Sequence, residues 1–400
     1  MGAGIAQVAA SADWTVLLRD VTEDVVHRAI TGIASQLDRL VEKGKLQQAD
    51  RDAIIGRIHP AIESAALHDC HLLIEAIIED FDIKTHVLRD LMPSLRADCI
   101  IASNTSSLSI TRISEAIGAP GRTVGMHFFN PAPIMKLVEI IAGKKSDPVV
   151  VNRVADIAQS WGKVVARAND VPGFIVNHVA RPYYLEAFRM LEDGIEAISH
   201  PRVIDHVMKE YGGFRMGPLE LTDLIGQDVN AATTRSVWQQ LGKPPLLAPS
   251  PLQEQLVRDG HLGRKTKRGV YDYDVDPPAV AIIPSINFIA DRDISSELSA
   301  LAFDFAQAAS GQTLKPAADS VAYIFSRILI AVIAQAHHAF ERGVASRDDI
   351  DTAMKFGVNY PKGPFEWTRQ IGAGRCIALL HALNQTVADN RFEVPASMRK

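Results

Sequence analysis

The chain has 400 residues, 47% of them hydrophobic and 22% charged, which is the balance of a soluble globular protein with room for two or three domains. With a net charge of −5, the composition shows no strong electrostatic sign of nucleic-acid binding. The three cysteines lie far apart and fit neither a disulfide framework nor a metal site. With no signal peptide apparent, they favour a reducing cytoplasm.

The chain opens with Met1-Gly-Ala-Gly-Ile, then an Ala-rich helical stretch, then a strand that leads to Asp20. This resembles the tail of a Gly-x-Gly-x-x-Gly dinucleotide-binding turn with Gly2 as its third glycine, although a plain helix N-terminus explains it equally well. An acidic residue placed like Asp20 binds the ribose hydroxyls and favours NAD over NADP. The first strand and glycines of such a turn do not precede Met1, so we expect a misplaced start or a truncation.

The first half of the chain alternates short apolar runs with helical patterns, which is typical of a parallel α/β sheet. Two helices are expected over 21–45 and 84–95. Strands buried on both faces are continuously apolar. Six runs fit that description and are predicted to be strands: 14–18, 72–74, 99–102, 122–126, 136–141 and 163–166.

Most of the candidate catalytic side chains lie between Ser103 and Glu139. The string Ser103-Asn-Thr-Ser-Ser107 follows one predicted strand, at the edge where α/β sheets bind ligands, while His127 ends the next strand and Glu139 lies in the strand after it. A histidine paired with a carboxylate suits removal of a hydroxyl proton. Taken singly, His127 also fits a structural role and the serines fit a turn. Glu139 within an apolar run requires a partner.

After Asn169 the pattern becomes helical, and we place a domain boundary there, followed by a second boundary near 269–273. An internal repeat then follows, because Val203–Met208 with Gly217-Pro-Leu-Glu220 recurs as 349–354 with Gly363-Pro-Phe-Glu366 at the same spacing. We therefore expect a dinucleotide-binding domain at 1–169, a helical domain at 170–273, a connector of unassigned structure at 274–315 and a second helical copy at 316–400. The apolar run 323–336 is too short to span a bilayer and is predicted to be a buried helix.

Together these segments resemble the 3-hydroxyacyl-CoA dehydrogenase family over residues 1–273 and, through the repeat, about 316–400. The most specific strings are His127-Phe-Phe-Asn-Pro131 and Pro172-Gly-Phe-Ile-Val-Asn177. Within the family the chain is most similar to two-repeat bacterial enzymes of phenylacetate breakdown that act on 3-hydroxyadipyl-CoA. The resemblance implies an α/β Rossmann-type domain followed by two copies of an all-α domain like the C-terminal domain of 6-phosphogluconate dehydrogenase.

The resemblance also implies an activity and a set of site residues. The reaction would be NAD-dependent oxidation of a (3S)-3-hydroxyacyl-CoA, such as 3-hydroxyadipyl-CoA or 3-hydroxybutyryl-CoA, in fatty acid or phenylacetate catabolism. His127 would be the general base, oriented by Glu139, while Ser106 and Asn177 would bind the substrate near C3 and its thioester oxygen. The other implied contacts are to NAD at Gly2, Gly4, Asp20, Glu79, Lys84 and Lys265, and to a coenzyme A phosphate at Lys43.

The second helical copy has Ser326 where the first has Asn177, so we expect one active site per chain. Helical domains of single-copy relatives pair between subunits. We therefore expect either a homodimer or an intrachain pseudo-dimer, with no nucleic-acid or membrane partner. Two other hypotheses stay open: an NAD-linked dehydrogenase of a smaller hydroxy acid, and a truncated form that is inactive or only binds ligands.

Overall fold

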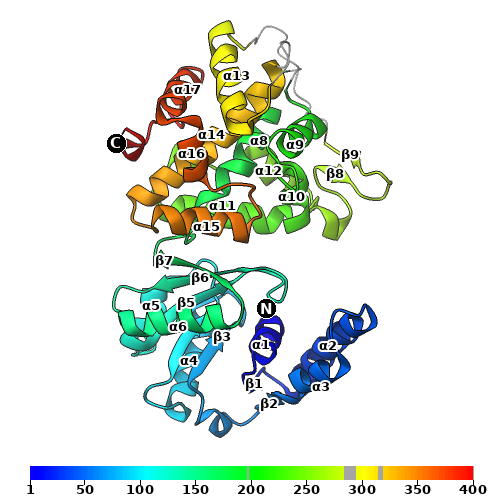
Figure 1. Ribbon diagram of the computed structural model, residues 1–400, viewed down its shortest axis with the longest axis vertical. Coiled ribbons are helices and arrows are strands. Elements are labelled where there is room, and N and C mark those ends of the chain that lie inside the picture. Colours follow the sequence, from blue (N-terminus) through cyan, green and yellow to red (C-terminus); the bar gives the residue numbers. More distant parts are fainter. Residues whose placement is uncertain (196–197, 283–293, 314–318, 400) are drawn as a thin grey trace. The chain divides into compact units, whose positions relative to one another are not determined.

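The computed structural model describes residues 1–195, 198–282, 294–313 and 319–399 (Figure 1). It divides into two units, Met1–Phe174 and Ile175–Lys400, and each is described by itself. The first is an α/β unit and the second is almost entirely helical, as the sequence predicted.

The main sheet of the α/β unit has five strands in the order β3-β4-β5-β6-β7. Strands β3, β4 and β5 are parallel, but β6 runs antiparallel to β5, and β7 runs parallel to β6. The expectation of a wholly parallel sheet is therefore wrong. All five strands lie at predicted positions: Leu72–Glu75, Ile100–Ser103, Thr123–Phe128, Leu137–Ala142 and Val164–Asn169.

The sixth predicted strand, β1 (Val16–Leu18), pairs in parallel with β2 (Ile58–Pro60) in a separate two-stranded sheet. The helices α2 (Glu23–Glu42) and α3 (Gln48–Gly56) form a hairpin that leads from β1 to β2 (Figure 1). The helix predicted over 21–45 corresponds to α2, whereas α3 and β2 were not predicted from the sequence. A three-residue strand that ends in proline is too short to give a periodic signal.

Helices cover both faces of the main sheet. Residues of β4 point alternately to the two faces, so Ile100 and Ala102 pack with α1 (Gly2–Ser11) and α6 (Pro148–Ser160). Ile101 points to the other face. There it packs with Leu88 of α4 (Phe81–Leu91) and Ile113 of α5 (Ile110–Ala116). This double coverage explains why the strands read as continuous apolar runs.

The helical unit is arranged around α14 (Asp319–Glu341). This helix is long and apolar enough to cross a membrane, but 89% of its apolar window is buried within the protein, which makes it a core helix. The other helices of the unit are α7 to α13 and α15 to α17, spanning Val176–Val179, Arg181–Asp193, Pro201–Glu210, Pro218–Ile225, Gln227–Gln240, Pro251–Arg258, Ser296–Ser310, Arg347–Gly357, Pro364–Ile371 and Ala373–Gln385. Helix α13 lies in the connector for which no structure was predicted, and the two-residue strands β8 (Tyr271–Asp272) and β9 (Ala279–Val280) were not predicted either.

The internal repeat has a shared structural basis. In the first copy the carboxylate of Asp205 on α9 accepts hydrogen bonds from the first-turn N–H groups of Leu219 and Glu220 of α10. In the second copy Asp351 on α15 accepts the same two bonds from α16. A side chain at either helix-preceding glycine would collide with the aspartate, which explains the Asp-to-Gly spacing in both copies.

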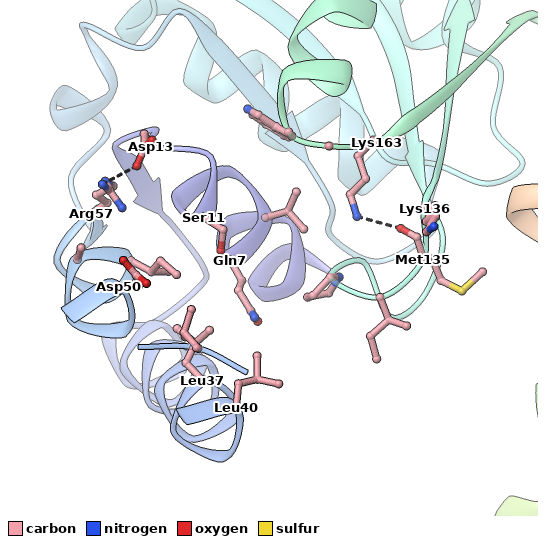
Figure 2. Close-up of a pocket in the computed structure, with 18 residues that line it drawn as sticks. Gln7, Ser11, Asp13, Leu37, Leu40, Asp50, Arg57, Met135, Lys136 and Lys163 are labelled. Atoms are coloured by element: carbon pink, nitrogen blue, oxygen red, sulfur yellow. Dashed lines mark hydrogen bonds and ion pairs between the residues drawn. The ribbon is translucent and has the colours of Figure 1, made fainter. Parts of the chain in front are cut away.

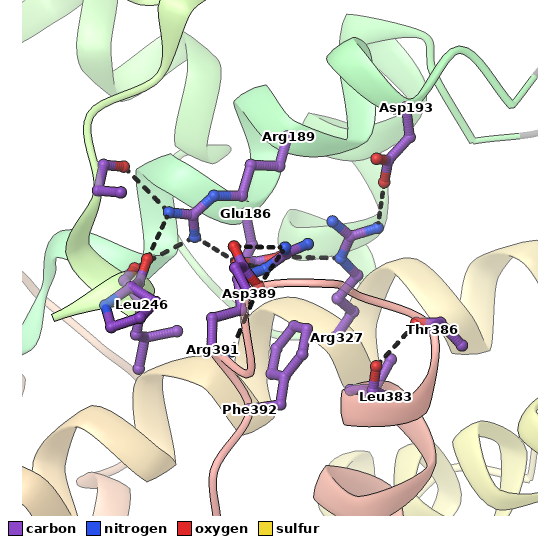
Figure 3. Close-up of polar contacts among 12 residues, drawn as sticks. Glu186, Arg189, Asp193, Leu246, Arg327, Leu383, Thr386, Asp389, Arg391 and Phe392 are labelled. Carbon is purple, nitrogen blue, oxygen red and sulfur yellow. Dashed lines mark hydrogen bonds and ion pairs between the residues drawn. The ribbon is translucent and has the colours of Figure 1, made fainter.

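A buried ionic cluster joins the two copies (Figure 3). Glu186 of α8 is fully buried and accepts hydrogen bonds from Arg189 of its own helix, from Arg327 of α14 and from Arg391 near the C-terminus. Arg327 also contacts Asp193, at 2.6 Å. Buried ion pairs therefore connect the second copy to the first.

Candidate active site

The central pair of the α/β unit is His127 on β5 and Glu139 on β6. These two residues are direct partners in the antiparallel ladder, and Nδ1 of His127 lies 2.7 Å from Oε2 of Glu139. Glu139 is fully buried and His127 is 7% exposed. A carboxylate that accepts the Nδ1 proton fixes the tautomer in which Nε2 carries the lone pair. The imidazole is thereby prepared to take a proton through Nε2.

Two aromatic rings lie against this histidine, and one amide is bonded to the backbone of the next residue. The His127 ring lies 4.6 Å from that of Phe129 and 5.9 Å from that of Phe174. The β4–β5 ladder ends at Ser103 and Gly125, and beyond it Oδ1 of Asn104 accepts the Phe128 N–H at 2.8 Å. This role of Asn104 was not predicted from the sequence. The residue stood in the polar string after β4, but nothing in the sequence indicated its partner.

The predicted site residue Ser106 and its neighbour Ser107 contact Glu79. One carboxylate oxygen of Glu79 accepts hydrogen bonds from the backbone N–H and the hydroxyl of both serines, and from the hydroxyl of Thr105. Burial opposes ionisation, but these bonds and the charge of Lys84 hold the pKa of Glu79 below its usual value. A carboxylate is therefore anchored beside the hydroxyl of Ser106.

Lys84 lies inside the α/β unit. Its side chain is 1% exposed and donates to Glu75 at 2.7 Å, and Glu79 lies 3.3 Å away. Ser103 also donates to Glu75, at 2.6 Å. The ammonium group thus orders two carboxylates and does not face solvent, which differs from the direct cofactor contact expected for this lysine.

The expected nucleotide contacts lie around α1. Gly2 and Gly4 form its first turn, where backbone N–H groups have no partner within the helix and can bind an anion. A side chain at Gly4 would press against Pro133, so this glycine also permits close packing. Asp20 follows β1 and is exposed. The donor set at the helix start and the acidic residue after β1 fit a dinucleotide.

The helical unit carries two further predicted residues. Asn177 on α7 is half-buried, and its Oδ1 accepts a hydrogen bond from Nη2 of Arg181 at 3.3 Å. Lys265 donates to both carboxylate oxygens of Asp228, at 2.6 Å each. In the second copy Ser326 is buried and donates to the backbone of Ala302, which occupies its hydroxyl within the core.

A pocket of about 650 Å³ opens in the α/β unit between α1, the α2–α3 hairpin and the loop before β6 (Figure 2). Lys136 and Lys163 line it, and Lys163 donates to the backbone oxygens of Ala132 and Met135. Two more lining groups, Oε1 of Gln7 and Nε1 of Trp161, are buried and have no hydrogen-bond partner among the residues that the structure describes. Lys43 is exposed at the end of α2 and does not line the pocket.

Comparison with known proteins adds two family matches. Residues 1–171 match the family described as "3-hydroxyacyl-CoA dehydrogenase, NAD binding domain". Residues 173–273 and 323–400 match the family described as "3-hydroxyacyl-CoA dehydrogenase, C-terminal domain". The two stretches matched by the C-terminal domain contain the two copies of the Asp-to-Gly repeat.

Individual relatives carry related names. The chain is 36% identical to a 3-hydroxyadipyl-CoA dehydrogenase of Escherichia coli, over 100% of this chain and 95% of that protein. It is 38% identical to a probable 3-hydroxybutyryl-CoA dehydrogenase of Deinococcus radiodurans, over 68% of this chain and 96% of that protein. A crystal structure of 3-hydroxybutyryl-CoA dehydrogenase from Escherichia coli K12 superposes with a TM-score of 0.87 at 36% identity, covering 100% and 95% of the two chains.

Proposed function

The chain belongs to the 3-hydroxyacyl-CoA dehydrogenase family of NAD-dependent oxidoreductases, and on that premise we propose that His127 and Glu139 carry the reaction. The observation that supports this most is the 2.7 Å contact between the imidazole and a fully buried carboxylate. Such a pair removes a proton from an alcohol efficiently because the imidazolium that forms is stabilised by the carboxylate beside it.

The reaction converts the C3 hydroxyl of the acyl chain into a ketone. Nε2 of His127 takes the hydroxyl proton, while Glu139 keeps the ring oriented and balances its positive charge. NAD, when bound, would supply the acceptor for the hydride that leaves C3. In the reverse direction His127 returns its proton to the ketone oxygen. We propose that Asn177 donates a hydrogen bond to one substrate oxygen, and that the hydroxyl of Ser106 turns away from Glu79 to donate to another, so that C3 is held in position.

The residues around α1 are proposed to bind the cofactor. The N-terminus of α1 with Gly2 and Gly4 would take the pyrophosphate, and Asp20 would bind the ribose hydroxyls. Lys265 would leave Asp228 to reach a phosphate or ribose oxygen. Glu79 would contact the cofactor beside Ser106, and Lys84 would act indirectly by fixing the carboxylate of Glu79.

The pocket of the α/β unit is proposed to hold part of coenzyme A. Its lysines supply positive charge for phosphate groups, and Lys43, exposed at the end of α2, is a further phosphate contact. We propose a cytoplasmic enzyme in which the second helical copy provides, within one chain, the partner surface that a homodimer would otherwise supply. The Glu186 cluster between the two copies supports that arrangement.

The test is oxidation of NADH with acetoacetyl-CoA by the wild-type chain and by His127→Gln. We expect turnover by the wild type and a loss of about 10³-fold in kcat in the variant. His59→Gln, which changes an exposed histidine of β2, serves as the control and should keep wild-type activity. A folded wild-type chain that reduces free acetoacetate but not the thioester would contradict the proposal in favour of a dehydrogenase of smaller acids.

A further inference from the structure

Lys265, the proposed cofactor contact of the helical unit, stands on a short loop. It lies in a single 3₁₀ turn, Arg264–Thr266, and its side chain is 45% exposed. The chain closes on itself around this turn, because the N–H of Gly263 donates to the backbone oxygen of Arg268 at 2.8 Å. A lysine side chain has many rotamers, so it binds a ligand well only when its backbone is fixed. The groups that fix this loop therefore affect the proposed cofactor contact.

A buried carboxylate binds the segment that follows this loop. Asp223, near the end of α10, is 1% exposed. It accepts the N–H of Val270 at 3.0 Å, the N–H of Tyr271 at 2.9 Å and the hydroxyl of Tyr273 at 3.0 Å. The side-chain amide of Gln227 donates to the same carboxylate at 2.7 Å. Asp223 therefore anchors the chain directly after the loop, from a helix that precedes the loop in the sequence.

The backbone of the loop also packs directly on Asp223. A Cβ atom at Gly263, two residues before Lys265, would lie 2.3 Å from the backbone oxygen of Asp223. At Gly269, four residues after Lys265, a Cβ atom would lie 1.9 Å from the carboxylate. Both distances are much shorter than any real contact, so a side chain would not fit at either point. Lys265 therefore stands between two places at which the loop touches one buried residue.

The second helical copy shows that this anchor is not part of the repeated fold. The α10–α11 turn and the α16–α17 turn each contain a glycine at positive φ in nearly the same conformation. Three residues before this glycine, Arg369 takes the place of Asp223. Two residues after it, Gly374 takes the place of Asp228, which pairs with Lys265 in the first copy. The second copy thus forms the same turn without either carboxylate, and both occur in the copy that carries Lys265.

We propose that Asp223 is a positioning residue for cofactor binding: by holding residues 263–270 in one conformation, it keeps the ammonium group of Lys265 available to the bound cofactor. This inference rests on the proposed function, because the contact between Lys265 and NAD is part of it. Asp223 is buried and acts only through the loop. Without this anchor the loop would become ordered only when the cofactor binds, and the cost of ordering it would weaken binding.

The first experiment measures the anchor itself, without cofactor. In Asp223→Asn the side chain keeps its size, but whichever way the amide turns, its NH2 group faces some of the four donors. We expect amide hydrogen exchange in residues 262–273, measured by mass spectrometry, to become faster by at least about tenfold. Asp351→Asn, at a buried aspartate of the second copy, should leave exchange in this segment unchanged. Wild-type exchange in Asp223→Asn would overturn the inference.

The second experiment asks whether Asp223 acts through Lys265. The Kd of NADH is measured by fluorescence titration in the wild type, in Asp223→Asn, in Lys265→Met and in the double variant. We expect each single variant to raise the Kd by about five- to tenfold, and the double variant to bind no more weakly than Lys265→Met. Asp351→Asn should keep the wild-type Kd, which separates positioning from a general loss of stability in the helical unit.

The outcomes separate this inference from the proposed function. If the two effects multiply in the double variant, or if Lys265→Met raises the Kd and Asp223→Asn does not, the positioning role is overturned and the cofactor contact stands. A wild-type Kd in Lys265→Met would remove Lys265 from the cofactor site and overturn the inference with it. A folded wild-type chain that does not bind NADH would count against the proposed function itself.

A milder variant decides if Asp223→Asn does not fold. Tyr273→Phe removes one of the four donors and leaves the carboxylate in place. It should raise the Kd of NADH by about two- to threefold in the wild-type background and not at all in Lys265→Met. Tyr211→Phe, at the end of α9, is its control and should keep the wild-type Kd. A wild-type Kd in Tyr273→Phe, or an equal rise in both backgrounds, would overturn the inference.

Discussion

Nδ1 of His127 lies 2.7 Å from Oε2 of Glu139, and the backbones of the two residues are paired across strands β5 and β6. Both side chains therefore stand on rigid, neighbouring strands in the buried part of the sheet. Their alignment is set by strand register and does not depend on a loop. A proton acceptor built in this way needs little reorganisation during the reaction.

Replacing the carboxylate tests this alignment. Glu139→Gln keeps the size of the side chain but removes the negative charge that fixes the tautomer and stabilises the imidazolium. We expect kcat to fall by about 10²–10⁴-fold with a small change in KM for acetoacetyl-CoA. Glu115→Gln, at a half-exposed glutamate of α5, is the control. Wild-type kcat in Glu139→Gln would show that the contact is structural only.

The second support of the histidine is testable through Asn104. Asn104→Ala removes the acceptor for the Phe128 N–H and should lower kcat by about tenfold, because the end of β5 loses a bond beside His127. Asn104→Asp retains the acceptor oxygen and should recover most of kcat. KM for the thioester is expected to stay constant in both. A rise in KM at unchanged kcat would assign Asn104 to substrate binding instead of positioning.

The His127–Glu139 pair could be predicted because a histidine at a strand end and a carboxylate within an apolar run both stand out in sequence. The antiparallel direction of β6 could also have been predicted from the sequence, because residues 129–136 are too few for the crossover that a parallel strand requires. The burial of Lys84 could not be predicted from the sequence. It depends on how α4 packs and on the facing carboxylate of Glu75, and neither leaves a periodic signal.

In the helical unit, too, some features could be predicted from the sequence and others could not. The repeat was visible because the Asp-to-Gly spacing has a steric basis at both Asp205 and Asp351. The cluster around Glu186 was not, because its partner Arg327 is 141 positions away in the sequence. Contacts between copies arise from tertiary packing, and one sequence carries no record of which arginine reaches which acid.

Cofactor choice provides a prediction at Asp20. This exposed carboxylate follows β1, where it would accept ribose hydroxyls and repel a 2′-phosphate. Asp20→Asn should raise KM for NADH and narrow the discrimination against NADPH by about tenfold, measured as the ratio of kcat/KM values. Asp24→Asn, at an exposed aspartate in the first turn of α2, should leave the ratio unchanged. An unaltered ratio in Asp20→Asn would remove Asp20 from the cofactor site.

The ionic cluster predicts a large stability effect. Burial disfavours the charge of Glu186, but Arg189, Arg327 and Arg391 lower the pKa of its carboxyl to about 2. Glu186→Gln leaves these arginines without their shared buried carboxylate and should reduce the free energy of unfolding by about 3–5 kcal/mol in urea titrations. Glu210→Gln, at an exposed glutamate of α9, should change it by less than about 0.5 kcal/mol. A small effect at Glu186 would show that the copies are held by apolar packing.

Asp205 predicts how stability varies with pH. Burial raises the pKa of Asp205 to about 7, although Tyr271 and two backbone N–H groups donate to it. The folded protein therefore keeps this proton at pH values where the unfolded chain has lost it. Its contribution to stability is fully present below about pH 4, declines as the pH rises toward 7, and is constant above that.

The Asp205→Asn variant has no proton to lose at this position. Its free energy of unfolding minus that of the wild type should therefore increase with pH, by up to about 1.4 kcal/mol per pH unit between pH 5 and 7, and stay constant above that. Urea unfolding of both proteins at pH 5, 6, 7 and 8 measures this difference, with Asp259→Asn, at an exposed aspartate, as the control. A difference that stays constant across the series would mean that the three hydrogen bonds keep Asp205 ionised throughout, and that burial does not dominate at this position.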